Sequence, residues 1–244
     1  MERVLALGGG GFLMEDGRSA IDEYLLELAH RDRPRICFVP TPSGDLPEHL
    51  EKFYAAYTPA LCEPTHLSFF RKPSENSVAP AGLEEHILSR DIVFVGGGNT
   101  KSALGVWREW GLDAVLGRAL KAGVILSGMS AGAMCWFELG LTDSFWGPEL
   151  QPLRCLGFLP GSCGVHYGSD SKRRPALHAA LKSGTVSRAV AIDDYAAVLY
   201  RDGQVERVLS WSSGATAYSV TISDGNVDES AYEAQNIARR GANS

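Results

Sequence analysis

The 244-residue sequence lacks several features that would mark particular classes of protein. No apolar run is long enough to span a bilayer. The first residues, Met-Glu-Arg-Val-Leu-Ala-Leu-Gly, lack the basic stretch and apolar core of a signal peptide. The net charge of −6 argues against a nucleic-acid partner, because such a partner requires a basic surface. We therefore expect a cytoplasmic protein whose partners include neither nucleic acid nor membrane.

Cysteine is scarce, and its spacing excludes two further classes. The five cysteines are an odd number and form no C-x-x-C pair, which is typical of free thiols in a reducing compartment. No His or Cys cluster has the spacing of metal ligands, so we expect neither a metal nor a cofactor. The sequence also lacks internal repeats, low-complexity stretches and linkers, so residues 1–244 are expected to form a single domain.

Short apolar segments alternate with amphipathic ones along the first half of the chain. The apolar segments predict strands and the amphipathic ones predict helices: strands at 3–8, 34–41, 67–70, 91–95 and 124–129, helices at 19–30, 46–61, 83–89, 99–110 and 112–121. This alternation predicts an α/β fold with a largely parallel central sheet and helices on both faces.

The last quarter of the chain has a different pattern. Strand-like segments flank the Asp-Gly turn at residues 202–203, which predicts additional antiparallel strands. The polar segment 228–244 predicts a surface helix and a frayed tail. These strands could cover an edge of the sheet or form a dimer contact, so both a monomer and a homodimer remain open.

A Gly-x-Ser-x-Gly pattern, Gly128 to Gly132, follows the apolar segment 124–127. It is typical of a nucleophile elbow, a sharp strand-to-helix turn that exposes a serine hydroxyl. Ser130 would be the nucleophile, and the Ala131 N–H at the helix start would stabilise a developing oxyanion. The pattern is short, so a glycine-rich turn with an incidental serine is the competing interpretation.

Two other glycine runs follow predicted strands. Gly8–Gly11 resembles a dinucleotide fingerprint, but Leu13 stands where its third glycine should be, which favours a close backbone approach at the sheet edge. Gly96–Gly98 precedes Asn99 and lies at the same carboxyl edge as Ser130. A glycine N–H there could be a second oxyanion donor. Asn99 could bind substrate, cap the following helix, or do both.

His166 lies in a glycine-flanked segment, and the other five histidines lie on predicted helix flanks or at a strand start. It is therefore the candidate general base. The acidic pair Asp193-Asp194 lies between two apolar segments. One of the two carboxylates could orient a histidine, or the pair could form a solvated turn.

Several of these segments together resemble the peptidase E family, serine peptidases related to cyanophycinase whose fold is similar to class I glutamine amidotransferases. The similar segments are Phe94–Thr100, Gly128–Ala133, Cys135–Glu138, Thr142–Ser144, Val165–Tyr167 and Ile192–Tyr195. Each is short, but their order and spacing extend the resemblance over most of the chain.

The resemblance implies a Ser–His–carboxylate site that cleaves dipeptides with an N-terminal aspartate. It assigns Ser130 as nucleophile, His166 as base and Asp194 as the orienting acid, with Gly98 and Ala131 as oxyanion donors. It also places Asp143 near the site, and it places an aspartate-binding arginine at Arg173 or Arg174. An α/β-hydrolase would instead need Asp143 as the acid, but Asp143 is too close in sequence to the elbow helix.

The sequence departs from the family pattern at three points. Asp194 replaces the glutamate of peptidase E, Val165 precedes His166 where relatives often have proline, and the arginine register is open between Arg173 and Arg174. Three functions therefore remain: an aspartyl dipeptidase, a cyanophycinase-like hydrolase of β-aspartyl or other small amides, and a non-catalytic ligand-binding protein. Cys135 is expected to pack in the core rather than act as a nucleophile.

Overall fold

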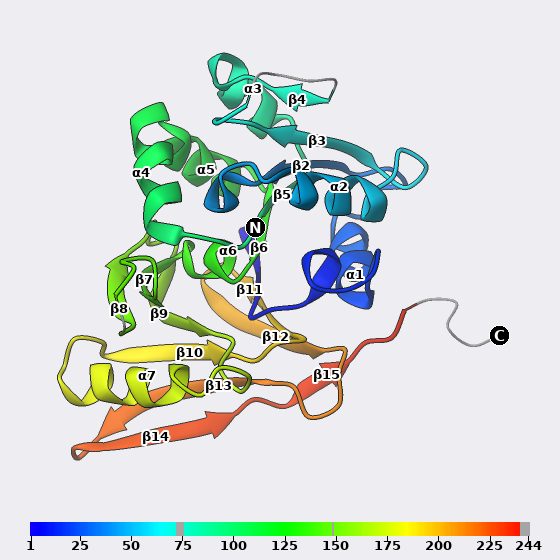
Figure 1. The fold of residues 1–244 in the computed structure, drawn as a ribbon. Helices are drawn as coiled ribbons and strands as arrows, with labels where there is room; N and C mark the ends of the chain where they lie inside the picture. The colour runs from blue at the N-terminus through cyan, green and yellow to red at the C-terminus, as the bar shows by residue number, and fades with distance from the viewer. Residues whose placement is uncertain (72–75, 148, 240–244) are drawn as a thin grey trace.

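The computed structural model describes residues 1–71, 76–147 and 149–239, which form two β-sheets and the helices that cover them (Figure 1). The larger sheet contains β1 (Arg3–Leu7), β2 (Arg35–Val39), β3 (Glu63–Leu67), β4 (Ser77–Val78), β5 (Ile92–Val95), β6 (Ile125–Met129), β11 (Ala196–Arg201), β12 (Gln204–Ser210) and β15 (Ala234–Asn236). The smaller sheet contains β7 (Phe137–Thr142), β8 (Gln151–Arg154), β9 (Leu159–Val165), β10 (Arg188–Ile192), β13 (Ala217–Ser223) and β14 (Asn226–Ala231).

The larger sheet has the strand order β15-β12-β11-β1-β6-β5-β2-β3-β4. Strands β1, β6, β5, β2, β3 and β4 are parallel, and β11 joins β1 in antiparallel orientation. A largely parallel central sheet with added C-terminal antiparallel strands is the predicted fold class, and it is confirmed.

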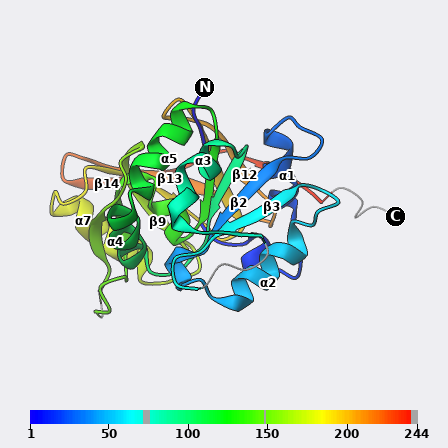
Figure 2. The same cartoon turned by 90° about the horizontal axis from the view of Figure 1, so that it is seen from above.

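Both faces of the parallel strands are apolar, because helices cover both. The helices are α1 (Ala20–Leu28), α2 (Pro47–Ala56), α3 (Leu83–Leu88), α4 (Thr100–Trp110), α5 (Leu112–Lys121), α6 (Ala131–Met134) and α7 (Arg173–Lys182). Leu5 and Leu7 face α1 and α2, while Val4 and Ala6 belong to the core on the opposite face. Figure 2 shows α1 and α2 on one side of the sheet and α4 and α5 on the other.

The smaller sheet packs against that second core. Cys163 and Val165 of β9 and Ile192 of β10 are buried in the same cluster as Val4 and Ala6. Helix α7 covers the other face of the smaller sheet, where its Leu177 and Leu181 pack. The arrangement brings the carboxyl ends of β9 and β10 to the carboxyl edge of the larger sheet, and an isolated bridge joins Gly9 to Asp194 there.

The surface helix predicted from residue 228 onward is wrong for the described part of that segment. Residues 226–231 form β14, which pairs with β13, and residues 234–236 form β15, which pairs in parallel with β12. Val227 and Glu229 are half-buried while their neighbours are exposed, so the segment has the period of a strand with one covered face. Residues 240–244 of the predicted tail lie outside the described residues.

The third strand lies earlier than predicted. Strand β3 ends at Leu67 instead of beginning there, because residues 63–66 pair in parallel with residues 35–38 of β2. The aromatic residues that suggested the strand form a turn. The Asp45 carboxylate accepts hydrogen bonds there from the N–H groups of Phe69 and Phe70, both at 2.7 Å.

Candidate active site

Ser130 lies at the turn between β6 and α6 with φ 56° and ψ −109°, a conformation that L residues rarely adopt. A Cβ atom on Gly132 would clash with the Val95 carbonyl oxygen, and one on Gly128 would lie 2.7 Å from the same oxygen. Glycine is therefore required on both sides of the serine by close packing against β5. The structure has the strand–turn–helix geometry that the Gly-x-Ser-x-Gly pattern predicts.

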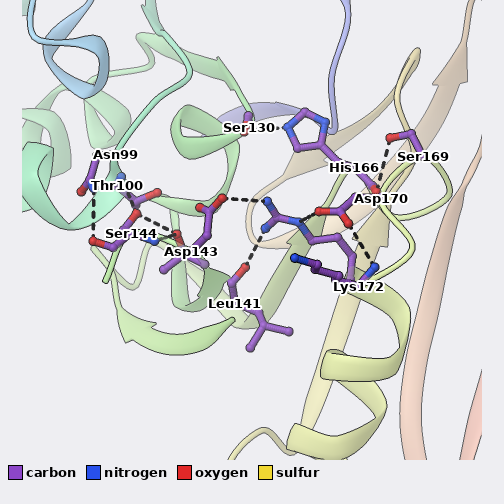
Figure 3. Close-up of polar contacts among 12 residues, drawn as sticks. Asn99, Thr100, Ser130, Leu141, Asp143, Ser144, His166, Ser169, Asp170 and Lys172 are labelled. Atoms are coloured by element: carbon purple, nitrogen blue, oxygen red, sulfur yellow. Dashed lines mark hydrogen bonds and ion pairs between the residues drawn. The ribbon is translucent and has the colours of Figure 1, made fainter. Parts of the chain in front are cut away.

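His166 connects the serine to a carboxylate. Its Nε2 lies 2.9 Å from Ser130 Oγ, and its Nδ1 lies 2.6 Å from Asp194 Oδ1. The Ser130 and His166 side chains point toward each other in Figure 3. The histidine directly follows β9, and the next N–H, that of Tyr167, donates to the Ile192 carbonyl at 3.2 Å. Three separate segments thus contribute to one hydrogen-bonded chain.

The environment of Asp194 keeps its carboxyl group ionised. Burial alone would raise its pKa, but hydrogen bonds from His166 and Ser169 and the positive charge of Arg173 leave that pKa below its usual value. An ionised carboxylate can only accept hydrogen bonds, so Nδ1 of His166 carries the proton. In the neutral ring, Nε2 is then free to accept the Ser130 hydroxyl proton.

The two neighbouring aspartates have different surroundings. Asp193 Oδ2 accepts a hydrogen bond from the Thr216 N–H at 3.2 Å, and its residue is 8% exposed. Only Asp194 meets the histidine. The acidic pair is therefore not a solvated turn, and the structure favours Asp194 as the orienting acid.

The first glycine run packs directly behind this acid. A Cβ on Gly9 would clash with Asp194 Oδ1 and would lie 3.0 Å from His166 Nδ1. The Tyr195 N–H donates to the Gly9 carbonyl at 3.0 Å. The run therefore serves a close backbone approach at the sheet edge, as the sequence indicated in preference to a dinucleotide site.

Gly98 and Ala131 are the predicted oxyanion donors. Gly98 has φ 137°, and a Cβ there would clash with the Pro42 carbonyl. The Cβ position of the neighbouring Gly97 is 3.6 Å from Ser130 Cβ. Within the described part of the chain, neither the Gly98 nor the Ala131 N–H donates a hydrogen bond. Both amides are thus available to an oxygen on a substrate.

Asn99 acts as the cap of α4. Its Oδ1 accepts from the Ser102 N–H at 2.9 Å, and its Nδ2 donates to the Ser144 carbonyl at 3.1 Å. Sequence reasoning missed Ser144, whose buried hydroxyl accepts a hydrogen bond from the Thr100 N–H at 2.9 Å. These contacts, visible in Figure 3, fasten the segment that carries Gly98 and Asn99 to the segment that carries Asp143.

The two arginines lie in the first turn of α7 and point in different directions. Arg173 is 8% exposed; its Nε donates to Asp170 Oδ2 at 3.0 Å, and its Nη2 lies 3.5 Å from Asp143 Oδ2. Arg174 pairs with Glu229 at 2.5 Å and covers the Tyr167 ring. The geometry favours Arg173 as the arginine of the site. Asp170, which the sequence analysis did not select, lies at the i, i+3 spacing that could have revealed this pairing.

A cavity of about 740 Å³ lies beside Gly98. Asn99, Asp143, Asp170 and Lys172 contribute polar groups to its wall, and Trp146, 88% exposed, lines it from the segment after β7. Several carboxylates and one ammonium group therefore face this cavity, whose described lining does not include Ser130 or His166.

Residues 1–71, 76–147 and 149–239 contain no group of three or more His, Cys, Asp or Glu side chains that could hold a metal ion. Cys135 is fully buried, and burial holds the pKa of its thiol well above the usual value, so it packs in the core as predicted. No helix in the described ranges is long and apolar enough to cross a membrane.

The sequence model of peptidase family S51 matches residues 4–208. The chain belongs to peptidase family S51. This is the peptidase E family that the sequence motifs resemble. A member from Bacillus subtilis (strain 168), the uncharacterized peptidase YgaJ, is 43% identical over 229 residues, which cover 94% of this chain and 96% of that protein.

Two solved structures share the fold of this family S51 member. A peptidase from an acI-B1 actinobacterium superposes with a TM-score of 0.70 at 15% identity, covering 95% of this chain and 97% of that one. A candidate peptidase E from Listeria monocytogenes EGD-e has a TM-score of 0.62 at 16% identity, covering 87% and 100%. At these identities the likeness concerns the fold.

Proposed function

We propose that this family S51 member is a cytoplasmic serine peptidase that cleaves small peptides through an acyl-enzyme on Ser130. The observation that carries the proposal is the hydrogen-bonded chain from Ser130 Oγ through the His166 ring to Asp194. Ala131 directly follows this serine, and the Cβ position of Gly97, next to Gly98, lies 3.6 Å from Ser130 Cβ. All five cysteines lie in described residues and are unpaired thiols, which agrees with a reducing compartment.

In this mechanism His166 Nε2 takes the proton of Ser130 as its oxygen attacks the peptide carbonyl, and it then gives that proton to the leaving amine. Asp194 holds the ring orientation and stabilises the positive charge that forms on it. The Gly98 and Ala131 N–H groups stabilise the tetrahedral oxyanion. Loss of one such donor typically lowers the rate about 10²–10³-fold. Water releases the acyl group by the same proton transfers.

Dipeptides with an N-terminal aspartate are the substrates we propose first. Arg173 is the buried guanidinium on the site side of α7, and guanidinium binds carboxylates in a bidentate manner. It already contacts Asp170 and Asp143, so a substrate carboxylate would have to replace one of these contacts.

The cavity gives a reason to test the cyanophycinase-like alternative too. Ligand sites of about 300–1,000 Å³ enclose drug-sized molecules. The cavity of about 740 Å³ beside Gly98 is lined by neither Ser130 nor His166, so its volume does not restrict the substrate to a dipeptide. Longer peptides and β-aspartyl amides belong in the same substrate panel.

The test is hydrolysis of Asp-p-nitroanilide, Asp-X dipeptides and β-Asp-X dipeptides by wild type, Ser130→Ala and Ser102→Ala. Ser102 is an exposed serine on α4 and serves as the matched control. We expect turnover by wild type and Ser102→Ala and none by Ser130→Ala. A folded wild type that cleaves β-Asp-X but not Asp-X would favour the alternative. One that cleaves nothing would favour a ligand-binding protein.

Replacing Arg173 tests the aspartyl preference separately. We expect Arg173→Lys to raise KM for Asp-X substrates about tenfold or more, because a single ammonium cannot form the bidentate contact. The matching change Arg174→Lys should leave KM within about twofold, since Arg174 faces Glu229. Equal effects of both changes on KM would contradict the proposal that Arg173 binds the substrate carboxylate.

A further inference from the structure

Asp193 is a buried carboxyl group that the proposed mechanism does not use. It follows β10, at the point where the chain leaves the smaller sheet for the larger one. Its Oδ2 accepts from the Thr216 N–H at 3.2 Å, whereas its Oδ1 is buried and forms no hydrogen bond of normal geometry within the described residues. Burial raises the pKa of this carboxyl, although nearby donors, including the Gly168 N–H, oppose the rise. Burying such a group costs free energy, so its position calls for a reason.

This Oδ1 atom faces the turn that carries the histidine. A Cβ atom on Gly168 would lie 2.8 Å from Asp193 Oδ1 and 3.4 Å from its Cγ. Gly168 is not one of the glycines with positive φ, so an alanine there would meet no backbone strain of its own. A side chain at 168 would therefore press on the Asp193 carboxyl and force it or the turn to shift.

Three successive contacts join the His166 turn to the segment after β10. The Tyr167 N–H donates to the Ile192 carbonyl at 3.2 Å, Gly168 packs on the Asp193 carboxyl, and His166 Nδ1 meets Asp194 at 2.6 Å. Since Asp193 is itself held by Thr216, the residue before β13, its carboxyl fixes how closely the turn approaches this segment.

We infer that Asp193 is a positioning residue: through its packing against Gly168, it sets the position of the His166 ring between Ser130 and Asp194. This inference rests on the proposed function, in which that ring moves the proton. A displacement of about 1 Å at a reacting group can cost about 10²-fold in rate, so a loose turn would lower kcat without removing any catalytic group.

A double-mutant cycle on Asp193→Ala and Gly168→Ala tests the inference. Each single change should lower kcat for the best substrate about tenfold or more while KM stays within about twofold. Asp193→Ala removes the carboxyl group that the new methyl group of Gly168→Ala would strike. The double variant should therefore be about as active as Asp193→Ala alone, not worse by the product of both effects. The inference would be overturned if the two losses in kcat multiply in the double variant. It would also be overturned if folded Asp193→Ala keeps the kcat of the wild type.

A second readout needs no substrate. The proton on His166 Nδ1 should give a low-field NMR resonance, identified by its loss in His166→Ala. We expect the resonance to be lost or shifted in Asp193→Ala but kept in Asp228→Asn, an exposed aspartate on β14. An unchanged resonance in Asp193→Ala would overturn the positioning role. If wild type cleaves no peptide, the proposed function fails, and this resonance still decides the role of Asp193.

Discussion

The candidate site has two halves that the fold builds in different ways. The Ser130 half stands on the larger sheet, where Gly128 and Gly132 pack against the Val95 carbonyl of the next strand. The His166 half stands on the smaller sheet, and it depends on the contact with Asp194, 28 residues further along the chain. Backbone packing between neighbouring strands of one sheet therefore positions the nucleophile, whereas a side-chain contact between two loop segments positions the base.

This difference leads to a division of effects. A side chain added in the nucleophile half disturbs the packing of β5 against β6, so it should reduce stability first. A side chain removed in the base half leaves most packing intact, so it should reduce activity first. Three experiments test this division, from the largest expected effect to the smallest.

The largest effect on kcat should come from removing the side chain of the nucleophile or of the base. We expect Ser130→Ala and His166→Ala each to lower kcat about 10⁶-fold, because serine and base act as a unit. The double variant should be no less active than either single variant. Steady-state kinetics with thermal unfolding as a check on folding would measure this. Losses that multiply in the double variant would show that the two residues act independently.

Asp22, buried beneath the larger sheet, and the half-buried Asp194 of the site have pKa values that shift in opposite directions. Burial raises the pKa of Asp22, on α1 beneath the larger sheet, to about 6, while that of Asp194 is lowered. Between pH 4 and 6 the unfolded chain releases the Asp22 proton while the folded protein keeps it. Rising pH should therefore cost the folded protein about 3 kcal/mol, given that each pKa unit corresponds to about 1.4 kcal/mol.

Denaturant unfolding of wild type and Asp22→Asn at pH 4 and pH 7 checks this sign. The free energy of unfolding of the wild type should fall relative to the variant as pH rises. For Asp194→Asn the wild type should instead lose stability relative to the variant as pH falls below the usual carboxyl range. A difference between wild type and Asp22→Asn that does not change with pH would contradict the raised pKa.

The smallest effect should come from the elbow glycines. Gly132→Ala places a Cβ against the Val95 carbonyl, so we expect a loss of about 1–3 kcal/mol in the free energy of unfolding. The control is Gly105→Ala on α4, where a Cβ meets no atom within 4 Å. It should stabilise the protein by about 0.5–1 kcal/mol. Equal changes in the free energy of urea unfolding for the two variants would contradict the view that Gly132 is required by its packing against Val95.

The same division explains how far the sequence alone was informative. The parallel core and the elbow could be predicted, because apolar runs and glycine spacing are local signals. The strands β14 and β15 could not, because the pairing with β13 and β12 that forms them lies outside the polar segment itself. Residues alone also left open which of Asp193 and Asp194 meets His166, since only the packing of the turn after β9 distinguishes them. The choice between Arg173 and Arg174 was open for a similar reason. Only their positions in the first turn of α7 show that Arg173 faces Asp170 and Arg174 faces Glu229.

The most direct test of the central claim is covalent labelling by a serine-reactive fluorophosphonate, read by intact mass and peptide mapping. The probe requires an activated serine and no knowledge of the substrate. We expect one adduct on Ser130 in the wild type and a strong loss of labelling in His166→Ala. No adduct on folded wild type, or equal labelling of both proteins, would contradict a serine activated by His166.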